Sequence, residues 1–103
     1  MADIQVIRAV FKERNYIFSH HASERAAKRL IRSHEIEEAI AVGEIIEDYP
    51  EDKYGASCLI LGYTDEQRPL HIQISYPPDL KIITVYEPST NKWESDWKTR
   101  KSS

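Results

Sequence analysis

The chain has 103 residues, of which 41% are hydrophobic and 30% charged, with a net charge of −3. This length predicts one small domain, which we place at residues 4–101. No apolar run approaches the roughly 18 residues of a membrane span and no leader-like segment opens the chain, so we expect a cytoplasmic protein without membrane contacts. The lone cysteine, Cys58, excludes an internal disulfide, and without a cluster of metal-ligand residues we expect neither metal nor cofactor.

The first part of the chain predicts three helices. A first helix is expected over residues 3–14, where apolar residues recur at helical spacing, namely Ile4, Ile7, Val10 and Phe11. After an extended link at residues 16–18, Ser19 offers an N-cap for a second helix, in which Glu24 and Lys28 pair on the outer side. Ser33 is the N-cap candidate of a third helix, which Gly43 closes.

From residue 44 onward the pattern becomes extended. We expect strands at residues 44–48, 57–63, 70–76 and 80–86, with short turns between the last three. Helices followed by hairpin-connected strands predict an α+β domain, in which the N-terminal helices pack on one face of a four-stranded, largely antiparallel sheet.

Charge is unevenly distributed along the chain. Residues 1–33 have a net charge of +4, residues 34–66 of −9 and residues 67–103 of +2. If the two outer segments meet in the fold, a basic face that suits a polyanion lies opposite an acidic one. The alternative is that the acidic segment is only a solvated surface.

The second predicted helix carries His21, Arg25 and Arg29 four residues apart, along one drifting ridge. Histidine exchanges protons near neutral pH because its ordinary pKa is about 6.5, and arginine offers a planar pair of donors to phosphate oxygens. This cationic ridge therefore suits a phosphodiester. The alternatives are a solvated helix edge, or ion pairs with nearby glutamates.

His71 is a candidate partner for this ridge. Metal-independent RNA cleavage needs a base for the 2′-hydroxyl, an acid for the leaving 5′-oxygen and cations for the transition state. His21 and His71 suit the first two roles, and Arg25 and Arg29 the third. The alternative for His71 is a solvent-facing position, or a buried one with its hydrogen bonds satisfied.

The register of the last hairpin decides whether Tyr86 lies beside His71. A two-residue turn at positions 78–79 pairs Tyr86 with His71 and brings Thr84 to the same face. A three-residue turn at positions 77–79 moves Tyr86 to the other face.

The tail predicts a short amphipathic helix, because Trp93 and Trp97 lie four residues apart among the cations Lys98 and Arg100. The two indoles either pack this segment on the core or stack RNA bases beside the cations.

The ordered motifs resemble an uncharacterised family called domain of unknown function 4258. The resemblance spans about residues 17–101 and rests on His21-Ala22 with Arg25 and Arg29, and on segments 35–40, 43–52, 58–62, 68–71 and 83–88. The family looks related to RelE/ParE-like toxins, small ribonucleases with helices before a four-stranded antiparallel sheet. The resemblance implies a RelE-like fold, metal-independent RNA cleavage and an antitoxin partner, in some cases of zinc-finger type.

Residues and resemblance together lead us to expect an RNA-cleaving toxin of a toxin–antitoxin pair. The expected catalytic residues are His21, Arg25, Arg29, His71 and Tyr86. The expected substrate-binding residues are Thr84, Trp93, Lys98 and Arg100. Two other hypotheses are a non-catalytic module that binds RNA or protein through the cationic ridge, and a protein-interaction domain whose ridge arginines pair with Glu35, Glu37 or Glu38.

Overall fold

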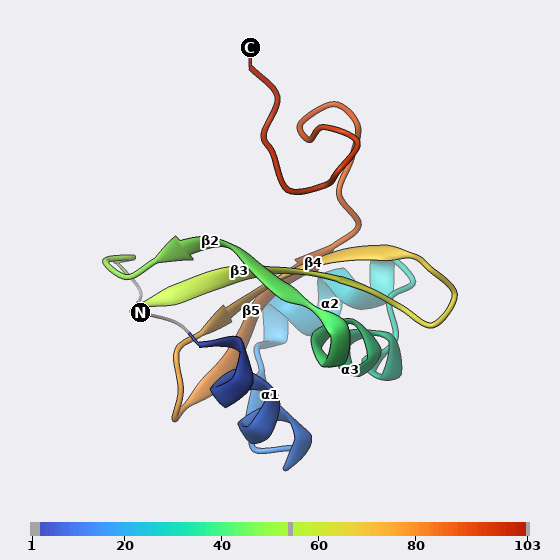
Figure 1. Ribbon diagram of the computed structural model, residues 1–103. Coiled ribbons are helices and arrows are strands. Elements are labelled where there is room, and N and C mark those ends of the chain that lie inside the picture. Colours follow the sequence, from blue (N-terminus) through green and yellow to red (C-terminus); the bar gives the residue numbers. More distant parts are fainter. Residues whose placement is uncertain (1–2, 54, 103) are drawn as a thin grey trace.

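The computed structural model describes residues 3–53 and 55–102 (Figure 1). Within them lie three helices, α1 (Ile4–Lys12), α2 (His20–Lys28) and α3 (Ser33–Val42). One five-stranded sheet has the order β1-β5-β4-β3-β2 and comprises β1 (Tyr16–Phe18), β2 (Glu44–Tyr49), β3 (Ser57–Tyr63), β4 (Pro69–Ser75) and β5 (Leu80–Tyr86). Figure 1 shows the helices on one side of the sheet and the C-terminal segment on the other.

The predicted α+β class is confirmed, but the sheet has five strands rather than four. Residues 16–18, expected as an extended link, form β1, which pairs in parallel with residues 80–82 of β5. α2 follows directly at His20, so β1 stays short. The outer edge of β5 beyond residue 82 therefore has no strand neighbour in the described part of the chain.

Local sequence explains where α2 and α3 begin. Ser19 is the N-cap of α2, as predicted, and its Oγ accepts the Ala22 N–H at 3.1 Å. Arg32 rather than Ser33 is the N-cap of α3, because Glu35 Oε1 accepts the Arg32 N–H at 2.9 Å and closes the first turn.

The predicted pair of Glu24 with Lys28 is wrong. Glu24 Oε1 lies instead 2.8 Å from His20 Nε2, one turn nearer the start of α2. The carboxylate thus takes the partner on the preceding turn, which is an equivalent i,i+4 neighbour.

The core lies between the helices and the sheet. Leu70, Ile72 and Ile74 of β4 are fully buried there, as the alternation predicted, and they pack with residues of α2 and α3. Cys58 also belongs to this core, and burial raises the pKa of its thiol to about 12. Gly62 lets β3 approach α3 closely, since a Cβ at this position would lie 2.0 Å from the Ala39 carbonyl oxygen.

The C-terminal segment, residues 88–102, does not form the predicted amphipathic helix. It consists of turns that an isolated antiparallel bridge between Trp93 and Arg100 holds together. Asp96 Oδ1 accepts the N–H groups of Lys98 and Thr99 at 2.8 and 3.0 Å, and Trp97 adopts a left-handed backbone with φ of 60°. A turn centred on Asp96 therefore replaces the helix that the tryptophan spacing suggested.

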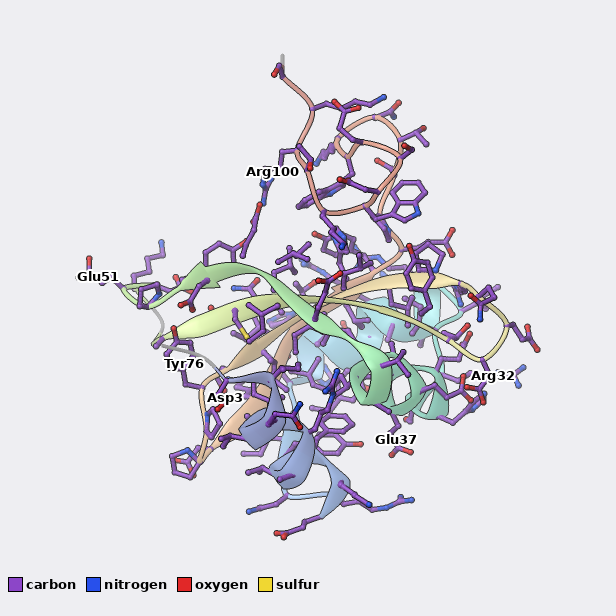
Figure 2. All side chains as sticks on the ribbon, viewed as in Figure 1. Asp3, Arg32, Glu37, Glu51, Tyr76 and Arg100 are labelled. Carbon is purple, nitrogen blue, oxygen red and sulfur yellow. The ribbon has the colours of Figure 1, made fainter. Side chains whose placement is uncertain are left out.

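Figure 2 places Arg100 of the C-terminal segment and Glu37 of α3 on opposite sides of the sheet. No helix in the described residues is long and apolar enough to cross a membrane.

Candidate functional site

Two members of the predicted catalytic set, His21 and Arg25, belong to a helix that packs on the opposite face of the sheet from His71. α2 packs through Ala22 and Ala26 on the face that holds the core. His71 belongs to the other face, because it alternates along β4 with the buried core residues. His21 and Arg25 are exposed on α2, so the structure does not bring His21 to His71.

The glutamates that were alternative partners for the ridge arginines are engaged elsewhere. Glu35 pairs with Arg68 at 3.3 Å, Glu37 lies 3.9 Å from Arg14, and Glu38 accepts the backbone N–H of Asp65 at 3.0 Å. Within the described residues, neither Arg25 nor Arg29 lies within 4.0 Å of a carboxylate. The ridge arginines are therefore not held in ion pairs.

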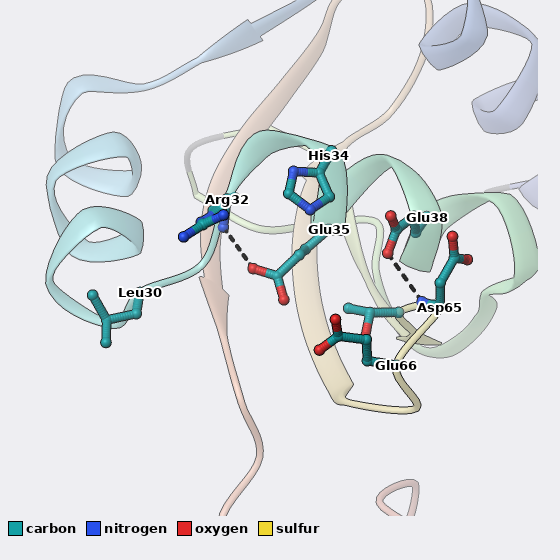
Figure 3. A pocket seen from close by; sticks show the side chains of 8 residues that line it. Leu30, Arg32, His34, Glu35, Glu38, Asp65 and Glu66 are labelled. Atoms are coloured by element: carbon teal, nitrogen blue, oxygen red, sulfur yellow. Dashed lines mark hydrogen bonds between the residues drawn. The ribbon is translucent and has the colours of Figure 1, made fainter.

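Part of the acidic middle of the sequence gathers near the start of α3. A pocket of about 500 Å³ there is lined by Glu35, Glu38, Asp65 and Glu66, together with Arg32 and His34 (Figure 3). Its carboxylates would repel a nucleic-acid backbone.

Arg29 is the ridge residue that reaches the sheet. It is the C-cap of α2, and its Nη1 donates to the Val85 carbonyl at 2.7 Å on the outer edge of β5. There it lines a pocket of about 400 Å³ with Tyr86, Lys92 and Arg100, and also with Glu87, Ser89 and Trp93. We call this the β5-edge pocket. His21 lies two helical turns away, roughly 12 Å along the axis, because each residue rises about 1.5 Å.

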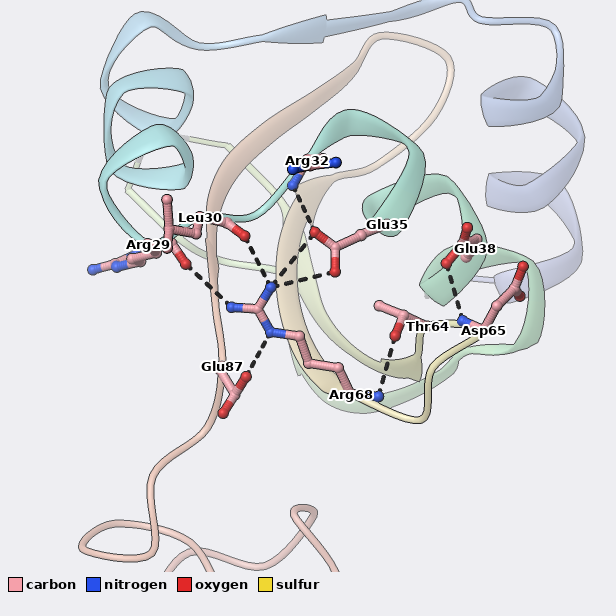
Figure 4. A network of polar contacts seen from close by, with 9 residues as sticks. All are labelled: Arg29, Leu30, Arg32, Glu35, Glu38, Thr64, Asp65, Arg68 and Glu87. Atoms are coloured by element: carbon pink, nitrogen blue, oxygen red, sulfur yellow. Dashed lines mark hydrogen bonds and ion pairs between the residues drawn. The ribbon is translucent and has the colours of Figure 1, made fainter.

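Arg68, which the sequence analysis did not select, holds the end of α2 in place (Figure 4). Its guanidinium donates to the carbonyls of Arg29 at 3.1 Å and Leu30 at 3.0 Å. The same group bonds Glu35 of α3 at 3.3 Å and Glu87, which follows β5, at 2.6 Å. One side chain before β4 thus fixes the end of α2, and with it Arg29, against α3 and β5.

A β-bulge in β5 sets Tyr86 opposite His71. Next to the turn, Ile74 pairs with Ile82, which is the register that would carry Tyr86 to the other face. The register shifts by one residue beyond this point, so that Gln73 pairs with Thr84 and His71 with Tyr86. The predicted pairing is therefore present, with the bulge rather than a two-residue turn as its cause.

His71 and Tyr86 form a hydrogen-bonded pair that borders the β5-edge pocket. His71 Nδ1 lies 3.1 Å from the Tyr86 hydroxyl, and Nε2 lies 2.7 Å from the Trp97 carbonyl oxygen. The His71 ring is fully buried beneath the C-terminal segment, edge-on to Trp93 with 4.4 Å between ring centroids. Burial lowers the pKa of His71 and raises that of Tyr86, because each charged form would lose its hydration.

The predicted substrate-binding residues of the tail also surround this face. Trp93 is 2% exposed, so its main role here is to pack the C-terminal segment on the sheet. Lys98 pairs with Glu44 at 2.7 Å, and Arg100 pairs with Glu47 at 2.8 Å while lying over the Trp93 ring. Thr84 is half-buried on β5.

Lys92 was also missed by the sequence analysis. It lines the β5-edge pocket and is exposed, and it has no carboxylate within 4.0 Å in the described part of the chain. Its place among the tail cations was the only signal in the sequence. For Arg68, the signal was its position in the motif at residues 68–71, directly before His71.

The family model for a Domain of unknown function (DUF4258) matches residues 18–87. No match was found among curated proteins or among solved structures. The matched residues include α2, α3 and β2 to β5, whereas α1, most of β1 and the C-terminal segment lie outside them. Since the match extends over more than half of the chain, the protein belongs to the DUF4258 family.

Proposed function

We propose that the protein is an RNA endonuclease that works without a metal, and that it acts at the β5-edge pocket. The observation that carries this proposal is the meeting of Arg29 and Lys92 with Tyr86, whose hydroxyl is hydrogen-bonded to His71. Cations for a phosphate and a pair of groups for proton transfer are what RNA cleavage by the adjacent 2′-hydroxyl requires.

In the proposed reaction, the substrate 2′-hydroxyl gives its proton to the Tyr86–His71 pair and attacks the neighbouring phosphorus. The bond from phosphorus to the 5′-oxygen breaks, and that oxygen takes a proton from a water molecule. The hydroxide that remains takes the proton from His71, which restores the neutral ring. The products are a 2′,3′-cyclic phosphate and a 5′-hydroxyl. Arg29 and Lys92 balance the negative charge of the transition state, while Arg100 is already paired with Glu47.

His21 and Arg25 extend the same cationic surface along α2. They are exposed two turns and one turn before Arg29, so a strand whose phosphate lies at Arg29 would run past them. In this proposal they bind neighbouring phosphates, and proton transfer by His21 stays a prediction from the sequence. The resemblance to RelE/ParE-like toxins supports a place in a toxin–antitoxin pair, with a protein antitoxin as the partner.

The second candidate is a non-catalytic module that binds RNA through the same cations. Burial of His71 and Trp93 beneath the C-terminal segment favours it, because neither ring offers an open face to a substrate. This candidate predicts salt-sensitive binding without cleavage products.

A cleavage assay with Tyr86→Phe separates the two candidates. The purified chain, incubated with end-labelled RNA and a chelator, should yield fragments ending in cyclic phosphate. Tyr86→Phe should slow cleavage at least about 100-fold and leave RNA affinity within about threefold, because only the proton-transfer group is lost. Tyr16→Phe is the matched control, since that hydroxyl faces Glu37 on the helix side of the sheet.

Binding without fragments in any buffer would favour the non-catalytic module. Cleavage that needs added magnesium, or that Tyr86→Phe leaves intact, would refute the proposed mechanism.

A further inference from the structure

We infer that the C-terminal segment completes the site: the Trp97 carbonyl fixes which ring nitrogen of His71 carries the proton, and so prepares His71 to accept the proton of Tyr86. Trp97 is on this view a positioning residue that acts through its backbone. The catalytic meaning of the inference rests on the proposed function, whereas the state of the His71 ring does not.

The hydrogen-bond partners of His71 determine its tautomer. A carbonyl oxygen only accepts, so the 2.7 Å contact to Trp97 requires the proton on Nε2. A neutral imidazole then has a bare Nδ1, which accepts the Tyr86 O–H at 3.1 Å. In the opposite tautomer, the lone pair of Nε2 would face a lone pair of the Trp97 carbonyl oxygen, at a fully buried position.

The surroundings of His71 favour the neutral ring. Burial lowers its pKa, and although the Trp97 carbonyl and Glu47 favour the charged form, Arg100 opposes it. Glu47 and Arg100 are the charged groups near the ring, and they pair with each other at 2.8 Å. Neutral His71 is therefore the expected form near pH 7.

This tautomer gives the Tyr86–His71 pair a direction. Because Tyr86 donates its own proton to Nδ1, its oxygen lone pairs remain free to accept a proton, and Tyr86 lines the β5-edge pocket. A proton from a substrate hydroxyl can then move to the Tyr86 oxygen as the Tyr86 proton moves to Nδ1, which leaves an imidazolium and a neutral phenol. With the proton on Nδ1, His71 would donate a hydrogen bond to Tyr86, and the pair could not accept the proton of a substrate hydroxyl in this way.

Several contacts hold the Trp97 carbonyl over His71. Asp96 caps the turn that contains Trp97, and the pairs Lys98–Glu44 and Arg100–Glu47 attach the C-terminal segment to β2. The family match ends at residue 87. The group that fixes His71 therefore comes from beyond the matched residues.

NMR of the full chain with isotope-labelled histidine tests the inference directly, with His71→Gln used only to assign the His71 signals. The wild type should show His71 with a protonated Nε2 and a bare Nδ1. Asp96→Ala, which releases the Trp97 turn, should give a mixture of tautomers and slow RNA cleavage at least about tenfold. Asp79→Ala, in the exposed turn between β4 and β5, is the matched control and should behave as the wild type.

Trp97→Gly separates the carbonyl from the indole. It keeps the carbonyl and suits the left-handed φ of 60°, so His71 should keep its proton on Nε2. A wild-type His71 that is protonated on Nδ1 or charged at pH 7 would overturn the inference. Faster cleavage by Asp96→Ala would also overturn it, because the C-terminal segment would then block the site rather than complete it. If the wild type cleaves no RNA, the proposed function fails, while the tautomer measurement still decides the role of Trp97.

Discussion

Replacing Arg68 by methionine tests whether one guanidinium holds the end of α2 against the rest of the fold. Methionine keeps an unbranched apolar stem and removes only the donors. The loss would leave the carbonyls of Arg29 and Leu30 without this partner, and it would leave Glu35 and Glu87 without their counter-ion (Figure 4).

The expected cost follows from how exposed each contact is. The side chains of Arg68 and Glu35 are 26% and 17% exposed, so their 3.3 Å pair is partly shielded from water. Hydrogen bonds to charged groups are each worth roughly 1.5–3 kcal/mol when shielded, but Glu87 is 51% exposed and its pair contributes less than about 1 kcal/mol. Water can reach the two carbonyls in part, so we expect Arg68→Met to lower the free energy of unfolding by about 2–4 kcal/mol.

Urea unfolding followed by tryptophan fluorescence measures this loss, because Trp93 is buried in the folded state. For a domain of this size, the expected loss corresponds to a fall in Tm of roughly 10–25 °C. Arg14→Met is the control, since that side chain is 80% exposed and lies 3.9 Å from Glu37, and it should cost less than about 0.5 kcal/mol. If both variants unfold at the same urea concentration, Arg68 does not anchor α2.

Three further predictions concern single groups. Burial lowers the pKa of His71 in the folded state, so the contribution of His71 to stability is present above its ordinary pKa of about 6.5 and is lost as the pH falls below that value. Urea unfolding measured across this pH range should show the loss of stability, and His71→Gln should make the stability less dependent on pH. The Cys58 thiol, whose pKa burial raises to about 12, should react with a thiol reagent at about pH 8 only after unfolding, and rapid labelling of the folded chain would contradict its place in the core. Arg29→Gln keeps a donor for the Val85 carbonyl but removes the charge, so the free energy of unfolding should change by less than about 1 kcal/mol. The slope of log RNA affinity against log salt concentration should become shallower by roughly 0.7. An unchanged slope would place the phosphate elsewhere.

The fold was largely predictable where its causes are local. The alternation in β4 identified the core face, and Ser19 marked the start of α2, because burial and capping act over a few residues. β1 was not predictable, since three residues gain strand geometry only by pairing with β5 near the other end of the chain. The tail was misread because tryptophans four residues apart also suit a turn closed by Asp96.

In the candidate site, too, features with local causes were predictable and those that depend on distant parts of the chain were not. His71 and Tyr86 were identified as neighbours, but only for one hairpin register, and no local pattern in the sequence marks the bulge that produces it. The ridge spacing put Arg29 on the second helix with His21, yet it could not show that Arg29 is the C-cap residue whose side chain reaches the Val85 carbonyl of β5. Arg68 was missed because its four acceptors come from parts of the chain that meet only in the fold.

The β5-edge pocket follows from how this sheet ends. β1 pairs with only three residues of β5, so the remaining edge of β5 presents backbone groups without a strand partner in the described residues. An open edge of this kind invites pairing with another chain unless a side chain covers it. Arg29 covers part of it by donating to the Val85 carbonyl, and its side chain lines the β5-edge pocket together with Tyr86. The residue that covers this part of the sheet edge thus also supplies one of the two cations of the proposed site, which links the short β1 to the chemistry that we propose.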